Sequence, residues 1–211
     1  MTEFILLSTT KVGDNSLVLH TLSKEYGRHS LIVRIGKNTG AYLPLNILSA
    51  EVKESSRTDL WKATNVDIEY PLSDTRGNIH KNTITLFLSE VLYRSLRDGC
   101  NEEELYPWCK KMILTLNSLK NDYASFHLRF LIEYAAILGF RADLRGIEPF
   151  AGERLEDLEN LLTLDFSEFL LYPLDGARRS EIAGILLEYL AYHLDCRLDI
   201  QSLRVLRELY A

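Results

Sequence analysis

The hydrophobic period of the chain changes near residue 80, and this change constrains the fold more than any other feature of the sequence. Up to about Asn78, apolar residues alternate with polar ones in short runs, as half-buried strands require. From Lys81 onward, apolar residues recur every three or four positions, which is the period of an amphipathic helix. The sequence therefore predicts an α+β protein with a β domain over residues 1–78 and an all-α domain over residues 79–211.

The first domain holds five short extended segments separated by turn residues. One connector is polar and contains Gly27, which suits a residue at positive φ in a hairpin loop. Five short strands in under eighty residues are enough to close a small barrel, and the OB-fold is one compact solution of this kind. We therefore predict a five-stranded OB-fold barrel from "FILLSTT", "SLVLHTLS", the alternating run that begins at Leu31, "LNILSAEVKES" and "LWKATNVDIEYP".

The second domain holds five helical patterns, "NTITLFLSEVLYRSLRDG", "NEEELYPWCKKMILTLNSLK", "DYASFHLRFLIEYAAILGF", "SEIAGILLEYLAYHLDCR" and "IQSLRVLRELY". Gly99 and Gly139 are expected to end the first and the third of them. The acidic run at 102–104 is expected in the first turn of the second helix, where the helix dipole favours carboxylates. Residues 141–178 have the weakest pattern and are predicted to be irregular, with a short helix at "ERLEDLENLLTL" and an extended turn at "SEFLLYPLDG".

Charge is distributed unevenly between the two domains. The chain has 24 Lys and Arg against 30 Asp and Glu, a formal charge of -6. Residues 1–80 contain nine of each sign, so the whole deficit lies in residues 81–211. This acidity argues against a protein that coats DNA along its whole length and favours local DNA contact combined with a protein partner.

Cations gather around the hairpin that contains Gly27. Bases on the strands of a barrel can follow a phosphate backbone while nearby aromatic rings stack on nucleobases. On the residues alone, ordinary solvated charges on an exposed hairpin explain the pattern equally well. The nucleic-acid hypothesis assigns the cations Lys24, Arg28, Arg34 and Lys37 and the stacking ring Tyr26, with Tyr42 as a second candidate ring.

No catalytic or metal-binding motif is present in the sequence. GxSxG, GxxxxGK[ST], HExxH and GxGxxG are all absent, and no two of the five histidines are four residues apart. Cys100, Cys109 and Cys196 have neither disulfide-framework nor metal-ligand spacing, which favours thiols in a reducing cytoplasm. No run approaches the roughly 20 apolar residues of a membrane span. We therefore expect a cytoplasmic protein without catalysis, cofactor or membrane contact.

Six segments together resemble the RecO family of bacterial recombination mediators: "SLVLHTLSKEYGRHSLIVRIGK", "YLPLNILSAEV", "LWKATNVDIEYP", "TITLFLSEVLYRSLRDG", "ASFHLRFLIEYAAILGF" and "DIQSLRVLREL". They span most of the chain in the family's order, and "LFLSEVLYRSL" is similar to the Bacteroidetes branch. The resemblance places the family's basic-glycine hairpin on Gly27 and Arg28 and its next basic residue on Lys37. Lys24 and Arg34 are added by strand alternation alone.

This resemblance implies an OB domain that binds single- and double-stranded DNA, joined to a helical domain. It implies annealing of complementary strands and, together with RecR, help in loading RecA onto single strands coated by the single-strand binding protein SSB. A protein-only adaptor of the same pathway, which never contacts DNA, is the alternative.

One feature of the family is missing from this chain. Many members carry a four-cysteine zinc site after the helix that ends in "LGF", whereas "RADLRGIEPFAGERLEDLENLLTLDF" contains no cysteine. We therefore predict no zinc. Apolar packing is expected to hold the region instead, through Leu158, Leu161, Leu162, Phe166 and Phe169.

The resemblance also implies a pocket for the SSB C-terminal tail in the helical domain. An acidic, aromatic-ended peptide requires an apolar cleft and a cation for its carboxylate. The candidates are Arg129 with Phe130, and Arg204 or Arg207 near the C-terminus. Surface pairs with Glu133, Glu208 and similar acids are the alternative for each arginine.

Overall fold

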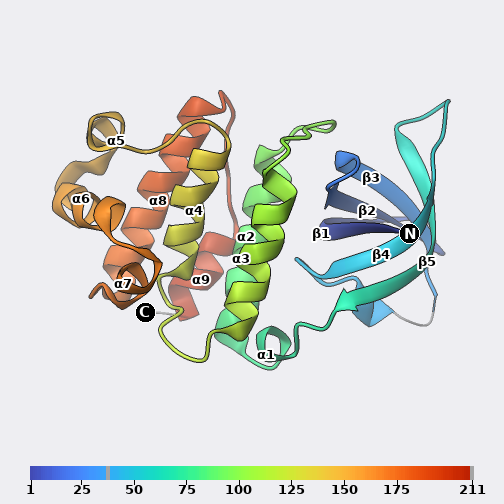
Figure 1. Cartoon of the computed structure of the whole chain (residues 1–211), viewed down its shortest axis with the longest axis horizontal. Coiled ribbons are helices and arrows are strands. Elements are labelled where there is room, and N and C mark those ends of the chain that lie inside the picture. Colours follow the sequence, from blue (N-terminus) through green and yellow to red (C-terminus); the bar gives the residue numbers. More distant parts are fainter. Residues whose placement is uncertain (37–38, 210–211) are drawn as a thin grey trace.

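The computed structural model describes residues 1–36 and 39–209, and its first half is a closed five-stranded barrel (Figure 1). The strands are joined in the order β1-β2-β3-β5-β4, and β3 runs parallel to β5 while the other pairs are antiparallel. This is the connectivity of an OB-fold, so the predicted fold class is confirmed. The strands are β1 (Thr2–Val12), β2 (Ser16–Ser23), β3 (Gly27–Arg34), β4 (Ile47–Lys53) and β5 (Leu60–Tyr70).

The apolar run of β1 is buried on both of its faces. Successive side chains of a strand point to opposite sides, so Phe4 and Leu6 face the barrel interior while Ile5 and Leu7 face outward. The outward pair does not meet solvent, because it packs into the core of the helical half. β1 therefore belongs to two cores and fixes the barrel against the helices.

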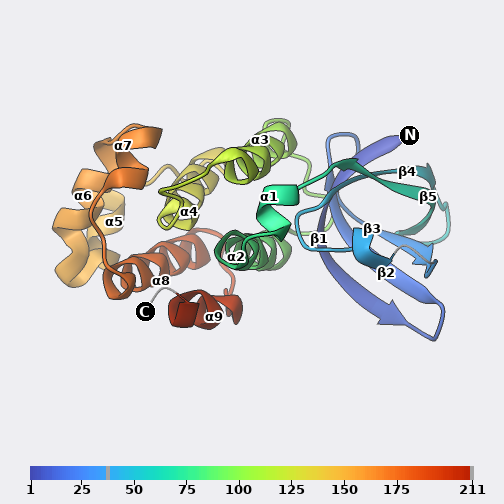
Figure 2. The same cartoon turned by 90° about the horizontal axis from the view of Figure 1, so that it is seen from below.

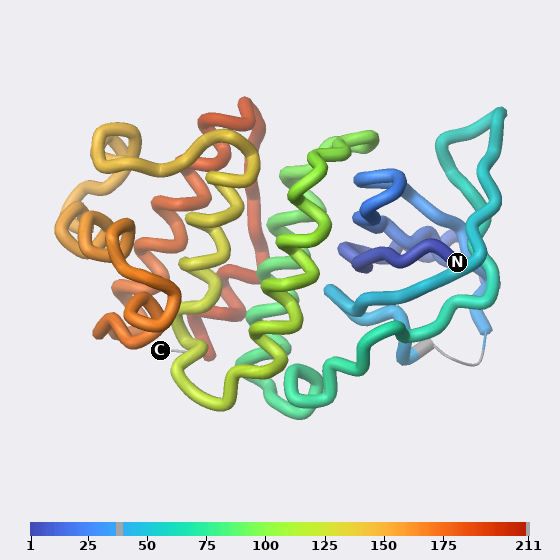
Figure 3. The backbone as a smooth tube through the Cα atoms, in the orientation of Figure 1, coloured from blue at the N-terminus to red at the C-terminus, as the bar shows by residue number. Residues whose placement is uncertain are grey.

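Helices occupy the second half of the chain; in both views α1, α2 and α3 lie nearest the barrel and α4 to α8 lie beyond them (Figures 1 and 2). The backbone passes from barrel to helices once, after β5 (Figure 3). The helices are α1 (Ser73–Arg76), α2 (Ile79–Ser95), α3 (Leu105–Ser118), α4 (Phe126–Ile137), α5 (Leu144–Ala151), α6 (Leu155–Thr163), α7 (Phe166–Leu171), α8 (Gly176–His193) and α9 (Ser202–Leu209), with short 3-10 turns at Thr39–Ala41 and Gly152–Arg154.

The segment 141–178 is more regular than its sequence pattern suggests. The short helix expected there is present as α6, but the expected extended turn is instead the helix α7. A capping box begins α7, in which Asp165 accepts from the Glu168 amide and the Glu168 side chain accepts from the Asp165 amide. Leu158, Leu161 and Phe169 are fully buried, so apolar packing holds this region as expected.

Two helix ends differ from the expectation. The acidic run at 102–104 precedes α3, whose N-cap is Glu104, so these carboxylates do not lie inside its first turn. α2 ends at Ser95, and Gly99 lies in the loop beyond it with φ +81°. Gly139 has φ +85° just after α4, as the sequence predicts for a residue that ends a helix.

Polar side chains join the two halves in addition to the shared apolar core. Glu3 of β1 accepts hydrogen bonds from the Tyr106 hydroxyl at 2.5 Å and from Lys110 Nζ at 2.7 Å. Arg76 donates to Asn46 Oδ1 at 2.6 Å. Since each of these contacts joins the barrel to a helix or to the chain between them, they fix the orientation of one half against the other. Within the described ranges, no helix is long and apolar enough to cross a bilayer.

Candidate nucleic-acid interface

The turn of the β2–β3 hairpin is attached to the loop that follows α2. Gly27 has φ +62°, as predicted, and a Cβ atom there would lie 2.2 Å from the carbonyl oxygen of Cys100. The amide of Arg28 donates to that same carbonyl at 2.8 Å, and the amide of Gly99 donates to the Arg28 carbonyl at 2.8 Å. Gly27 is therefore needed both for its backbone conformation and for this close approach.

Arg28 is not one of the surface cations of the barrel. Arg28 is only 4% exposed to solvent. Its Nη1 lies 3.4 Å from Asp98 Oδ1, and its guanidinium lies 5.2 Å from the ring centre of Tyr93. Burial lowers the pKa of Arg28, and the nearby Asp98 carboxylate opposes that shift. The expected phosphate contact does not fit this position, because the charge is already paired with the helical half.

The other hairpin cations do not gather at one place. Lys24 is exposed in the turn after β2, and Arg34 is exposed at the opposite end of β3. The strand from Gly27 to Arg34 covers roughly 23 Å at the usual rise per residue. Lys37 lies outside the described residues. The hairpin alone therefore does not form a single basic strip.

Strand register brings a different set of cations together. Lys53 of β4 pairs with Lys62 of β5, and Lys62 pairs with Ile32 of β3. Arg34 lies two residues beyond Ile32 and so points to the same side. Arg34, Lys53 and Lys62 are all exposed, and no ion pair of the described residues includes them.

We name Arg34, Lys62 and Lys53 the cation row. Adjacent strands are about 4.8 Å apart, which places neighbouring Cα atoms of the row within roughly 10 Å of each other. The sequence did not reveal Lys53 and Lys62 as members, because their pairing depends on the register of β4 and β5. The row offers three positive charges on the outer surface of the barrel.

Aromatic rings meet at one end of the barrel. Tyr26 packs edge-on against Trp61 with ring centres 5.0 Å apart, and His29 lies 3.8 Å from the same indole. All three residues are half-buried, and Trp61 directly precedes Lys62 of the cation row. Trp61 and Tyr42 are half-buried and both pack against the barrel core. Tyr26 and Trp61 therefore form an aromatic pair at this end of the barrel, of which the sequence analysis named only Tyr26.

Two of the expected partner-binding residues have structural roles. Phe130 is fully buried and packs on Trp108, with ring centres 4.7 Å apart, so it lines no surface pocket. Arg129 binds Glu133 at 2.6 Å and donates to the Leu164 carbonyl at 3.0 Å, which ties α4 to the segment before α7. A cleft made by Arg129 and Phe130 does not fit this arrangement.

The two candidate arginines of α9 differ from each other. Arg204 is exposed and lies 3.6 Å from Glu208 one helical turn later, which is a weak surface pair. Arg207 donates to the Ser180 hydroxyl at 2.6 Å and lines a hollow of about 620 Å³ at the start of α8. Of the four expected residues, Arg207 is therefore one that lines a hollow on the surface.

We searched the described residues for groups that could bind a metal ion and for a reactive thiol. Among residues 1–36 and 39–209, no three His, Cys, Asp or Glu side chains form a group that could hold a metal ion. Cys109 is completely buried, and burial raises the pKa of its thiol. A thiol of this kind stays protonated and unreactive at neutral pH.

The fold and the exposed cations define a class, namely proteins with an OB-type barrel followed by a helical domain. Two family models match the chain: Recombination protein O N terminal over residues 1–71 and Recombination protein O C terminal over residues 76–146. The chain belongs to the RecO family. This confirms the resemblance that the sequence segments carry.

Relatives match over nearly the whole chain at low identity. The DNA repair protein RecO of Flavobacterium psychrophilum is 26% identical, and the alignment covers 100% of this chain and 98% of the relative. The proteins of the same name from Phocaeicola vulgatus and Bacteroides fragilis are 23% and 24% identical, and each alignment covers 98% of this chain and 97% of the relative. The likeness therefore includes both halves of the molecule.

Proposed function

We propose that the protein is a non-enzymatic DNA repair and recombination mediator that binds single- and double-stranded DNA and anneals complementary strands. With RecR, it would help load RecA onto SSB-coated single strands. The observation that carries the proposal is the cation row on an OB-type barrel in a chain of the RecO family. The relatives named above carry the name DNA repair protein, which supports the same process.

The cation row is the proposed phosphate contact, with Lys24 as an outlying contact at the hairpin turn. Three adjacent cations on one face suit a flexible polyanion, because bound phosphates release condensed counterions. Tyr26 and Trp61 are the proposed stacking rings at the barrel end. Arg28 is left out of this surface because Asp98 already pairs with it.

The first test is titration of a fluorescent single-stranded oligonucleotide at low and high salt. We expect Arg34→Glu, Lys53→Glu and Lys62→Glu together to weaken binding roughly 10- to 100-fold at low salt and to flatten the salt dependence by about two units of slope. The matched control is Lys111→Glu, Arg141→Glu and Arg145→Glu, three exposed cations of the helical half with the same total charge change. An equal loss in both triple variants would reject the assigned surface.

The adaptor alternative gives a different result in the same assay. A protein-only adaptor would show no oligonucleotide shift in the unmodified chain at any salt concentration, while it still captured RecR or SSB. Metal-dependent turnover of the oligonucleotide would indicate an enzyme instead.

For the SSB tail, the proposed position is the hollow beside Arg207. Arg207 and the N-terminal end of the 18-residue helix α8 supply positive potential there. Asp175 and Glu181 also line the hollow, but Asp175 caps α8 and Glu181 accepts a hydrogen bond from Arg154. Unchanged affinity for an acidic tail peptide after Arg207→Glu would reject this position.

A further inference from the structure

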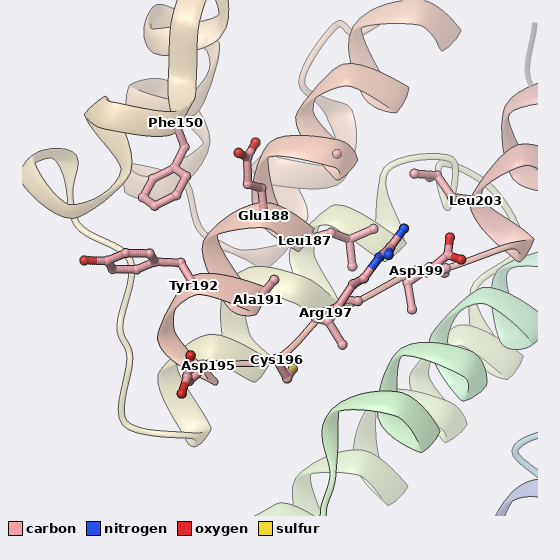
Figure 4. Close-up of a pocket in the computed structure, with 13 residues that line it drawn as sticks. Phe150, Leu187, Glu188, Ala191, Tyr192, Asp195, Cys196, Arg197, Asp199 and Leu203 are labelled. Atoms are coloured by element: carbon pink, nitrogen blue, oxygen red, sulfur yellow. The ribbon is translucent and has the colours of Figure 1, made fainter.

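A groove on the far side of the helical half has no role in the function proposed above. It has a volume of about 990 Å³ and lies between α5, the C-terminal half of α8 and the segment that leads into α9 (Figure 4). Figure 1 shows that α5 and α8, which supply two of its walls, lie on the side of α2 that faces away from the barrel.

The floor of the groove is apolar. Leu187 and Leu203 line it together with Ala191, and Gly184 leaves part of α8 uncovered, since a Cβ atom there would meet nothing within 4 Å. Removing apolar surface of this kind from water is favourable for any ligand that fits.

One wall of the groove is aromatic and faces solvent. Tyr192 is 71% exposed, and its ring lies edge-on to Phe150 with ring centres 5.6 Å apart. Figure 4 shows the two rings side by side at one edge of the groove. Exposed aromatic rings beside an apolar floor are typical of protein interaction sites.

The rim of the groove is acidic. Glu188, Asp195 and Asp199 line it with exposed carboxylates, and Arg197 is the cation among the lining residues. In the described part of the chain, none of these four residues takes part in an ion pair. The helical half also carries the whole net charge of -6. This potential disfavours DNA and acidic peptides and favours a positively charged ligand.

We propose that this groove docks a basic amphipathic segment of a partner protein. Apolar side chains of the segment would cover the floor and the ring of Tyr192, while flanking Lys or Arg residues would pair with Glu188 and Asp195. Helix-in-groove recognition uses this combination of apolar anchors and peripheral charges. The inference is independent of DNA binding, because the groove and the cation row share no residue.

The test uses the full chain and two labelled peptides of about 14 residues with leucines at helical spacing. One peptide carries lysine at all the positions that are not leucine, and its twin carries glutamate at those same positions. We expect the lysine peptide to bind at least tenfold more tightly than the glutamate peptide at low salt. Equal binding of the two peptides, or tighter binding of the glutamate peptide, would overturn the proposal.

Variants separate the groove from the general acidity of the helical half. Glu188→Lys with Asp195→Lys should weaken binding of the lysine peptide at least tenfold, whereas Glu156→Lys with Glu159→Lys on α6 should change it less than twofold. Tyr192→Ala should also weaken binding about fivefold while the thermal melting curve stays unchanged, because that side chain is largely exposed. Equal losses in both charge variants would show non-specific attraction and overturn the proposal. Concentration-dependent self-association that Tyr192→Ala abolishes would do the same, since the occupant would then be a second copy.

Discussion

At the turn of the β2–β3 hairpin, Arg28 is buried between Asp98 and Tyr93, whereas at the other end of the same strand Arg34 is exposed beside Lys62. Both are arginines of β3 that point away from the barrel interior. One attaches the barrel to the helical half, and the other is available to a ligand. Cations that cluster along a sequence can therefore be divided into structural and ligand-binding members only when the elements packed around each of them are known.

The variant expected to lower the stability of the protein most is a substitution of Gly27, at the buried end of β3. Gly27→Ala would force a Cβ atom to within 2.2 Å of the Cys100 carbonyl oxygen in a left-handed backbone. We expect the free energy of unfolding to fall by more than about 3 kcal/mol. Chemical denaturation measures this change.

Gly13→Ala is the matched control for that variant. Gly13 also has φ +62°, but a Cβ atom there would meet nothing within 4 Å. Gly13→Ala should lower the free energy of unfolding by only about 1 kcal/mol, because only the left-handed backbone conformation opposes the substitution. Equal losses in the two variants would show that the contact with Cys100 does not hold the hairpin turn.

The pH dependence of the free energy of unfolding measures a contribution from the helical core, away from the hairpin. Burial and, to a smaller extent, the nearby charge of Arg179 together lower the pKa of His127 from an ordinary value of 6.5 to about 3. His127 therefore stays neutral in the folded protein, while the unfolded chain takes up a proton below pH 6.5. Stability is fully present above pH 6.5 and falls by about 1.4 kcal/mol for each pH unit below it, which gives about 2 kcal/mol at pH 5.

The variant that checks this assignment is His127→Gln, measured by denaturation at pH 8 and at pH 5. Its loss of stability between the two pH values should be smaller than that of the unmodified protein by about 2 kcal/mol. His29→Gln at the hairpin serves for comparison, because burial lowers the pKa of His29 as well but the residue is only half-buried. A pH dependence that disappears in His29→Gln and persists in His127→Gln would contradict the assignment.

Two single substitutions of arginine, one at each end of β3, should have the smallest effects on stability and on oligonucleotide binding. Arg28→Gln should lower the free energy of unfolding by about 1–2 kcal/mol and change oligonucleotide affinity less than twofold, because its charge is buried and paired. Arg34→Gln should leave stability within about 0.5 kcal/mol and weaken the oligonucleotide about threefold. The opposite pattern would mean that the buried end carries the DNA contact.

Much of the fold follows from local patterns in the sequence. Alternation located the strands, a period of 3.6 located most helices, and the polar connector located Gly27 at positive φ. The sequence pattern did not predict the helix α7, because α7 has only six residues and begins with a capping box rather than with a long apolar stripe. Periodicity is too weak a signal at that length.

The candidate site followed from the sequence only in part. Arg34, Lys24 and Tyr26 were identified from the hairpin, but Lys53 and Lys62 were not, because strand register is a non-local property. The burial of Arg28 depends on Asp98, seventy residues later in the chain, and no local pattern reports such a contact. Phe130 was predicted to line a partner cleft but is buried against Trp108; helical spacing does not say which apolar face meets another helix and which meets solvent.

The strand β1 has a consequence for how the molecule can be divided. Because Phe4 and Leu6 fill the barrel while Ile5 and Leu7 fill the helical core, one strand supplies core residues to both halves. A barrel cut out on its own would expose an apolar stripe to water and invite aggregation. The two halves should therefore melt in one cooperative calorimetric transition, as a single thermodynamic unit despite their two architectures.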